Sequence, residues 1–242
     1  MLLLCAATAA EMLAAVPAGG LSHGEADFPL FKPVPLRLGR EGGVACVTGV
    51  GPINAALGMG IALAQCAAAG QQVRAIVNVG LAGSFDLGRW PLRSLHVVRE
   101  EIWPEYGLHD GRQVVAQAFG YPQWSDGRRE VRDRLALAAP AELGLSLRET
   151  AASALDAQGV RSLTVAGVSA SVMRVQHLRQ LYGAALENME GFAVAYAAAR
   201  AGLPCLEIRS VSNKVGPRTA EEKDFPGALR QLGCILPALN LV

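Results

Sequence analysis

The sequence predicts an α/β sandwich of three layers, in which helices cover both faces of a central sheet. Short apolar runs with the composition of strands alternate along the chain with longer Ala-rich stretches of helical period. The runs are apolar at successive positions, as in strands that are buried on both faces. The chain has 242 residues, 51% of them hydrophobic, and no segment resembles an interdomain linker. We expect one domain, residues 1–242, around a single large core.

The alternation gives each element a place in the chain. Strands are expected at residues 2–7, 43–51, 73–85, 94–103, 162–170 and 204–213, the third of them breaking into a glycine-rich turn. Helices are expected at residues 8–16, 52–70 and 189–202, with a further helix ending in 177–183 and another beginning after about Glu221. Thr8 is a candidate N-cap, Pro52 lies in the first turn of its helix, and Gly70 follows the end of that helix.

Composition excludes several classes of partner. The net charge is +1, and acidic and basic residues are interspersed, so there is neither a basic stripe for nucleic acid nor a polybasic patch for lipid. We expect a small-molecule partner, with no nucleic acid and no membrane. Residues 1–16 could pass for a signal peptide, but they lack a basic start and Glu11 interrupts the apolar stretch. We therefore expect a cytoplasmic protein.

Cysteine and histidine give no sign of a metal or redox centre. The five cysteines are scattered, and no two form a CxxC pair, so we expect reduced thiols in the core. The four histidines lack the spacing of metal ligands: His23, His96, His109 and His177. We expect surface or packing roles for them. Neither a metal nor another cofactor is expected.

Polar side chains gather where three predicted strands end. The first strand runs into Glu11, the third into "NVGLAGS" with Gly80 and Gly83, and the last into "RSVSN" at 209–213. Ligands of such sheets bind at the carboxyl ends of strands. The glycines match no phosphate-binding pattern, so we interpret them as a tight turn that lets a ligand approach the backbone. Taken alone, Glu11 could equally be a solvated helix residue.

Four segments together resemble the signature of the purine nucleoside phosphorylase and nucleosidase superfamily: "VTGVGPINAALG" (47–58), "VNVGLAG" (77–83), "ENMEGFAVAYAA" (187–198) and "EIRSVSN" (207–213). They follow the order of that superfamily and extend over most of the chain. The resemblance implies a nucleoside phosphorylase-like fold with a central mixed sheet. A further segment, "SNKVGPR" (212–218), is similar to the futalosine hydrolase branch, with Asn213 where adenine-specific nucleosidases have Asp.

The resemblance assigns Met189 and Glu190 to the ribose, because a Met-Glu-Gly sequence at a helix start grips the sugar in this superfamily. One carboxylate can accept hydrogen bonds from two adjacent hydroxyls, so Glu190 is expected at O2′ and O3′. Its place in the first helical turn is expected to keep it ionised. Met189 is expected either under the sugar or in the core. Glu187 is expected to face solvent, and Glu207 to pair with a neighbour rather than react.

The resemblance also implies hydrolysis rather than phosphorolysis. Phosphorylases of the superfamily carry Gly and Arg after the first strand and Arg before the glycine-rich turn, whereas this chain has "ATAAEM" (7–12) and Asn78. An uncompensated carboxylate repels a phosphate dianion. Glu11 matches the acid that activates water in the resembling nucleosidases, and Arg209 is expected to help hold that water. Leu81 departs from the Ser that those nucleosidases often have.

The two ends of the substrate have their own candidate residues. Asn213 is expected to donate a hydrogen bond to N7 of the departing purine, and its alternative role is that of a capping residue after the strand. Trp103 and Tyr106 could line an apolar pocket for the 5′ group or anchor their own loop. In the resembling family a neighbouring subunit supplies part of that pocket, so we expect a homo-oligomer.

Together these expectations describe hydrolysis of the N-ribosidic bond of futalosine in menaquinone biosynthesis, with release of hypoxanthine and dehypoxanthine futalosine. Two alternatives stay open. A methylthioadenosine or S-adenosylhomocysteine nucleosidase would release adenine from its own substrates. A purine nucleoside-binding protein without catalytic activity would return every nucleoside unchanged, because a fold does not determine function.

Overall fold

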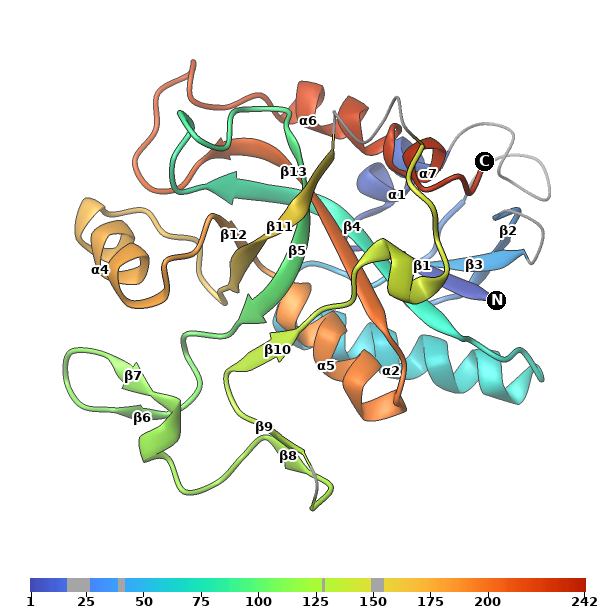
Figure 1. Ribbon diagram of the computed structural model, residues 1–242, viewed down its shortest axis with the longest axis horizontal. Helices are drawn as coiled ribbons and strands as arrows, with labels where there is room; N and C mark the ends of the chain where they lie inside the picture. Colours follow the sequence, from blue (N-terminus) through green and yellow to red (C-terminus); the bar gives the residue numbers. More distant parts are fainter. Residues whose placement is uncertain (17–26, 39–41, 128, 149–154) are drawn as a thin grey trace.

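A mixed sheet forms the centre of the molecule (Figure 1). The computed structural model describes residues 1–16, 27–38, 42–127, 129–148 and 155–242. Within these residues the sheet has nine strands: β1 Leu2–Ala6, β2 Val34–Leu36, β3 Gly43–Val47, β4 Ala75–Ser84, β5 Leu95–Ile102, β10 Arg134–Ala136, β11 Leu155–Thr164, β12 Leu186–Asn188 and β13 Cys205–Lys214. Two pairs of short strands lie outside it: β6 Leu108–His109 with β7 Val114–Val115, and β8 Trp124–Ser125 with β9 Glu130–Val131.

The strand order places several strand ends at one site. β1 is parallel to both β3 and β4, and β2 adds to β3 in the antiparallel direction. Beyond β4 the strands close into a ring, in which β4 pairs with β12 and β13, β12 with β11, β11 with β5, and β5 with β13. β10 pairs with β5. The ring brings β12 and the carboxyl end of β13 to the end of β4.

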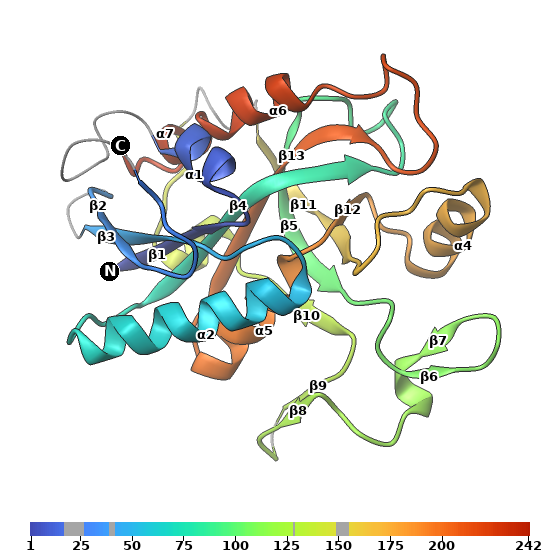
Figure 2. The same ribbon diagram turned by 180° about the vertical axis from the view of Figure 1, so that it is seen from behind.

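Helices cover both faces of the sheet, as Figures 1 and 2 show from opposite sides. On one face lie α1 Ala9–Ala15, α6 Phe225–Leu232 and α7 Ile235–Ala238; on the other lie α2 Pro52–Ala68 and α5 Gly191–Ala201; α4 Val172–Tyr182 stands beside β12. Successive residues of β1 belong to different cores, since Leu4 packs with the α1 and α6 layer and Leu3 with the α2 and α5 layer. This is why β1 is apolar at every position. The predicted three-layer α/β fold with a mixed sheet is confirmed.

Most predicted boundaries follow from local chemistry. Thr8 is the N-cap of α1, and its hydroxyl accepts the backbone N–H of Glu11 at 3.2 Å. Pro52 opens α2, and Gly70 follows the end of this helix with a φ of 68°, a conformation that glycine adopts without strain. Two short 3-10 helices, Ala116–Ala118 and Pro140–Leu143, were not predicted.

The glycine-rich turn expected near residue 80 is absent, and β4 continues through Gly80 and Gly83 to Ser84. Parallel pairing with β13 holds this segment extended, with Arg209 opposite Gly80 and Asn213 opposite Gly83. Neither glycine has a positive φ. Their role is to leave space: a Cβ on Gly80 would lie 2.6 Å from Arg209 Nη1, and a Cβ on Gly83 would lie 3.0 Å from Asn213 Nδ2.

Other expectations have mixed outcomes. β11 begins at Leu155, earlier than the predicted strand at 162–170, and β12 was not predicted as a strand. All five cysteines are free, and four are buried as expected: Cys5, Cys46, Cys66 and Cys205. Cys234 is exposed, so a core position for it is wrong. None of the helices in the described ranges is long and apolar enough to cross a membrane.

Candidate active site

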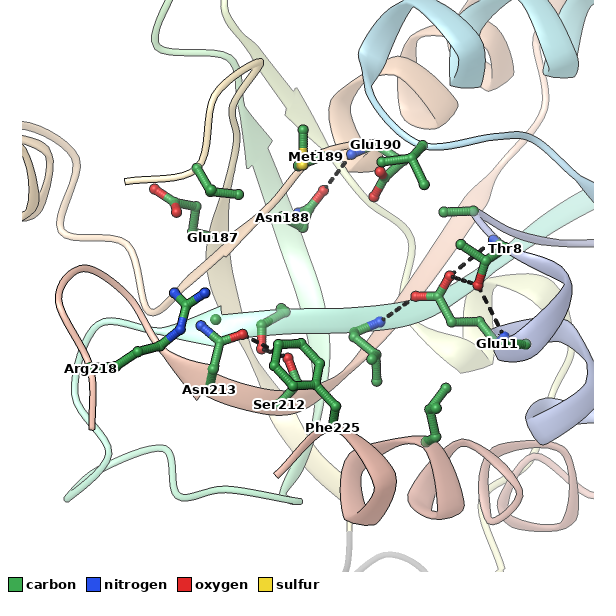
Figure 3. Close-up of a pocket in the computed structure, with 18 residues that line it drawn as sticks. Thr8, Glu11, Glu187, Asn188, Met189, Glu190, Ser212, Asn213, Arg218 and Phe225 are labelled. Atoms are coloured by element: carbon green, nitrogen blue, oxygen red, sulfur yellow. Dashed lines mark hydrogen bonds between the residues drawn. The ribbon is translucent and has the colours of Figure 1, made fainter. Parts of the chain in front are cut away.

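A cavity of about 360 Å³ lies where β1, β4, β12 and β13 meet the start of α5 (Figure 3). Its volume is within the range of small-molecule sites. Five residues predicted for the site line it: Glu11, Gly83, Met189, Glu190 and Asn213. They come from four different elements or loops, so only the folded chain assembles them. In Figure 3, Thr8 and Glu11 lie at one end of the cavity and Asn213 and Arg218 at the other.

The carboxylate of Glu11 is held in place by hydrogen bonds on both oxygens. Oε2 accepts from the Thr8 hydroxyl at 2.8 Å and from the Thr8 N–H at 3.0 Å, which completes a capping box. Oε1 accepts from the Leu81 N–H at 2.9 Å. The side chain is buried but borders the cavity. Leu81 therefore contributes a backbone donor at the position where its side chain departs from the expected Ser.

Glu190 faces the same cavity from the start of α5. Its Oε1 accepts the N–H of Gly51, the N-cap of α2, at 2.9 Å, and its Oε2 lies 3.8 Å from Arg209 Nη1. Burial raises the pKa of Glu190 above the ordinary glutamate value, while Arg209 and the Gly51 N–H lower it in part. The structure places Glu190 just before the first turn of its own helix, not within that turn. Glu190 is the N-cap of α5, and its carboxylate contacts the start of α2 instead.

Arg209 lies beneath the cavity wall and is 1% exposed. Its Nε donates to Glu207 Oε1 at 2.9 Å, which confirms that Glu207 pairs with a neighbour. Asn78 donates to the other oxygen of Glu207 at 2.9 Å. Arg209 is not among the residues that line the cavity, and neither is Gly80. Its guanidinium, packed against Gly80, instead connects the buried Glu207 with the cavity-facing Glu190.

A second buried carboxylate, Glu101, fixes the start of α5. It accepts hydrogen bonds from Thr164 Oγ1 at 2.7 Å and from Asn188 Nδ2 at 2.6 Å. The Oδ1 of Asn188 in turn accepts the N–H groups of Glu190 at 2.9 Å and Gly191 at 2.7 Å. Burial, together with the nearby Glu207 carboxylate, raises the pKa of Glu101 well above its ordinary value. A like charge so close favours the protonated form of Glu101, which can donate a hydrogen bond to Glu207.

The amide of Asn213 has one free donor. Its Oδ1 accepts from the Ser212 hydroxyl at 2.9 Å, and its Nδ2 donates to the Lys214 carbonyl at 2.8 Å. These contacts define which end of the amide is nitrogen. An amide nitrogen carries two hydrogens, so one N–H remains for a ligand in the cavity.

Sequence reasoning misplaced Glu187 and overlooked Arg218. Glu187 is 6% exposed and lines the cavity, so the expectation that it faces solvent is wrong. It accepts from the Ser169 N–H at 3.0 Å and from the Ser169 hydroxyl at 2.5 Å. Arg218 is an exposed side chain of the loop after β13 that also lines the cavity. The local sequence held no signal for Glu187, because β12 is only three residues long and the successive residues 187–190 all line the cavity.

The structure does not bring Trp103 and Tyr106 into this cavity. Trp103 lines a separate apolar cavity of about 320 Å³ with Phe192 and Tyr196. The rings of Trp103 and Tyr106 stack with their centroids 6.0 Å apart, and the Tyr106 hydroxyl donates to the Tyr121 carbonyl at 2.7 Å. Within a single copy of the described chain, both therefore anchor their own loop.

Metal ligands do not converge anywhere in the described ranges, since no three His, Cys, Asp or Glu side chains are grouped to hold an ion. His23 lies outside these ranges.

The mixed sheet and the carboxylate-lined cavity define an α/β protein with a small-molecule site, and comparison with known families gives its class. The model of the phosphorylase superfamily matches residues 8–232, and the chain belongs to this superfamily. Within it, the chain is 33% identical to the futalosine hydrolase of Thermus thermophilus, over 71% of this chain and 69% of that protein. A shorter match, 47% identical, covers 32% of this chain and 32% of the futalosine hydrolase of Acidothermus cellulolyticus.

Solved structures agree on the fold. A 5′-methylthioadenosine/S-adenosylhomocysteine nucleosidase from Helicobacter pylori has a TM-score of 0.72 at 18% identity, over 99% of this chain and 97% of that one. A futalosine hydrolase from the same species has a TM-score of 0.71 at 18% identity, over 99% and 97% respectively. Because the two nucleosidases match equally well, the fold alone does not select between their substrates.

Proposed function

We propose that this protein hydrolyses the N-ribosidic bond of futalosine and releases hypoxanthine and dehypoxanthine futalosine. The relatives that share its sequence over the greater part of the chain are named futalosine hydrolases. The observation that carries the chemistry is the pair of buried carboxylates, Glu11 and Glu190, on the wall of one cavity. One is placed to activate a nucleophile and the other to bind the sugar.

Water fits this cavity better than phosphate does. Three carboxylates line it, Glu11, Glu187 and Glu190. The guanidinium of Arg209 is already paired with Glu207 and lies close to Glu190, and Arg218 lies at the opposite end of the cavity from Glu11. A phosphate dianion would therefore enter a site of its own sign. Water carries no such penalty, which favours a hydrolase over a phosphorylase.

In the proposed mechanism Glu190 accepts the O2′ and O3′ hydroxyls of the ribose, and Met189 lies under the sugar. The bond from C1′ to the purine nitrogen breaks through an oxocarbenium-like transition state, and its electron pair leaves with the base. Glu11 takes a proton from water as the water oxygen bonds to C1′. Asn213 donates its free N–H to N7 of the departing purine, which then takes a proton from solvent.

Arg209 supports this reaction although it does not line the cavity. Its ion pairs hold Glu190 at the sugar, so we assign it a positioning role rather than direct contact with water. Gly80 leaves room for Arg209 beside Glu11, and Gly83 leaves room for Asn213. A side chain at Gly80 would displace Arg209, and a side chain at Gly83 would displace Asn213.

The 5′ end of futalosine requires an apolar surface that one copy of the chain leaves uncovered. Val50, Phe225 and Leu229 line the cavity. Beside it, Ile53 of α2 is 83% exposed next to the apolar cavity of Trp103. We propose that a second copy covers this surface in a homo-oligomer, where Trp103 and Tyr106 contribute to a 5′ pocket. The expected setting is menaquinone biosynthesis in the cytoplasm, in keeping with five free cysteines.

The test is a substrate panel in phosphate-free buffer, analysed by chromatography. Futalosine should yield hypoxanthine, and added phosphate should neither accelerate the reaction nor produce a sugar phosphate. Adenine released mainly from methylthioadenosine or S-adenosylhomocysteine would favour the alternative nucleosidase. Recovery of every nucleoside unchanged would favour a binding protein.

A further inference from the structure

Glu187 is a buried carboxylate on the cavity wall for which the proposed mechanism has no use. Its two oxygens are oriented by the N–H and hydroxyl of Ser169. Arg174 Nε donates to that hydroxyl at 3.1 Å and thereby brings a positive charge close to Glu187. Burial raises the pKa of Glu187, whereas Ser169 and Arg174 act in the opposite direction. A carboxylate fixed in this way keeps lone pairs that can accept a further hydrogen bond.

Glu187 lies at the end of the cavity where the base is expected, not at the end where the sugar is expected. In Figure 3 its carboxylate lies at the end of the cavity that holds Asn213 and Arg218, away from Glu11. Glu187 and Met189 are two residues apart, so an extended chain directs both side chains to the same side. Three residues of extended chain separate Glu187 from Glu190 by about 10 Å at most. A bicyclic base that extends from a ribose at Glu190 toward Asn213 therefore comes close to Glu187.

The three polar groups at this end form a pattern of one acceptor and two donors. An ionised carboxylate only accepts, a guanidinium only donates, and Asn213 has one free N–H. A 6-oxopurine presents N1–H as a donor, with O6 and N7 as acceptors. Adenine presents a donor at the 6-amino group and an acceptor at N1, so its edge has the opposite polarity at both positions. The pattern therefore complements hypoxanthine.

We propose that Glu187 is a specificity-determining residue that accepts the N1–H of a 6-oxopurine, while Arg218 donates to O6. This inference deepens the proposed function and rests on it for the identity of the nucleoside. Adenine would turn its unprotonated N1 toward the carboxylate and its amino group toward the guanidinium. Both contacts are repulsive, and discrimination of this kind arises when buried polar groups are left without partners.

The first test requires no mutation. Calorimetric titration of the wild-type protein compares hypoxanthine, 1-methylhypoxanthine and adenine. Methylation removes the N1 donor and leaves O6 and N7 intact. We expect 1-methylhypoxanthine and adenine each to bind at least about tenfold more weakly than hypoxanthine, the scale of one hydrogen bond to a charged group. Equal affinities for hypoxanthine and its 1-methyl derivative would overturn the proposal, whether or not futalosine is a substrate.

The second test uses Glu187→Gln, which has the same shape and can offer an N–H to N1 of adenine. The ratio of kcat/KM for futalosine to that for its 6-amino counterpart should move toward the amino substrate by at least about tenfold. The matched control is Glu105→Gln, because Glu105 pairs with Arg174 at 2.7 Å but does not line the cavity. That control should leave the ratio unchanged. The same shift in both variants, or in neither, would overturn base recognition by Glu187.

These outcomes are distinguishable from failure of the proposed function. If the wild-type protein does not release hypoxanthine from futalosine, the substrate assignment is wrong. The preference for hypoxanthine over its 1-methyl derivative in the titration would still establish recognition of the N1 edge. If futalosine is hydrolysed but the purines bind equally, the function stands and the role of Glu187 does not.

Discussion

The two ends of the cavity are built differently. At the sugar end, Glu11 and Glu190 are both 7% exposed, and each accepts a backbone N–H from a distant part of the chain, Leu81 or Gly51. At the base end, Glu187 is also buried and held by Ser169, but the amide of Asn213 hydrogen-bonds only to its sequence neighbours and Arg218 is exposed. Bond cleavage requires groups that are fixed before the substrate arrives. Recognition of a base tolerates side chains that adjust on binding. The preference for one base over another can then change by substitution in the loop after β13, which carries Arg218.

The sugar end also has a second layer of support. Behind Glu190 lie Arg209, Glu207 and Glu101, all buried and connected through charge or hydrogen bonds. The loss of one member leaves a neighbour buried without its partner, so each change should have a large effect. Changes at the base end should alter the choice of substrate more than the rate of the reaction. The predictions below separate these two behaviours, beginning with the largest effect.

Glu11→Gln should lower kcat for futalosine by about 100- to 10,000-fold, the contribution expected of a general base. Affinity for the nucleoside should be retained, because the amide has the same shape and can still accept the Leu81 N–H. Single-turnover kinetics and binding titration measure the two quantities separately. A kcat within about threefold of wild type would exclude Glu11 as the base that activates water.

Glu190→Ala should damage binding and rate together, with a loss of at least about 100-fold in kcat/KM. Each hydrogen bond to a charged group is worth about 1.5–3 kcal/mol, and the ribose offers two. Hypoxanthine alone should bind normally, because the base end keeps all of its groups. An unchanged affinity for ribonucleosides in this variant would remove Glu190 from the site.

Gly80→Ala should lower kcat by up to about 100-fold, as misplacement of groups by about 1 Å does elsewhere. The added methyl group would meet Arg209 Nη1 at 2.6 Å and Glu11 Oε1 at 3.1 Å, and neither side chain has free space. The matched control is Gly60→Ala in α2, where an added Cβ meets nothing within 4 Å. That control should keep full activity. Equal activity of both variants would mean that the Arg209 and Glu11 arrangement tolerates displacement.

Glu101 should give the stability of the protein an unusual dependence on pH. Its pKa is raised well above the ordinary glutamate value in the folded state, so in the pH window between the ordinary and the raised pKa the folded protein holds a proton that the unfolded chain releases. The free energy of unfolding should therefore fall as pH rises through this window, by up to about 1.4 kcal/mol per pH unit. Glu101→Gln removes the titrating group and should flatten the slope. Urea unfolding at several pH values measures the free energy of unfolding of the wild type and of the variant. The same dependence on pH in both proteins would contradict a protonated Glu101.

Much of the fold follows from local sequence. Thr8 and Pro52 define helix starts, and the apolar runs give β1, β3 and β13 close to their observed bounds. Met189, Glu190 and Asn213 were predicted because they lie in segments that resemble one superfamily. Glu11 was predicted because it follows the first strand and matches the acid that activates water in the resembling nucleosidases. Functional residues at the ends of strands and helices can therefore be identified from the sequence before the structure is known.

Features that depend on partners distant in sequence were not predictable. Gly80 is extended because β13 pairs with it, and the local pattern of glycines suggested a turn instead. β12 has only three residues, too few to show alternation, so Glu187 was assigned to solvent. The pKa of Glu190 depends on burial and on Arg209, neither of which its helix position reveals. In each case tertiary contact overrides the local signal.

The smallest effect we predict is at the base end, in Asn213→Asp. The amide donates to N7 or O6 at any pH, and it can also pair with the 6-amino edge of adenine, as amides do in DNA readout. The contribution of Asn213 to discrimination should therefore arise in the chemical step, because adenine is the poorer leaving group and requires a proton at N7, which an amide cannot supply. In the Asp variant the oxygen that replaces Nδ2 faces the Lys214 carbonyl, which favours a protonated carboxyl group able to deliver that proton. Preference between futalosine and its 6-amino counterpart, measured as kcat/KM, should move toward the amino substrate by at least about tenfold, or 1.4 kcal/mol. An unchanged ratio would leave Asn213 with its local role only, that of a cap between Ser212 and Lys214 at the end of β13.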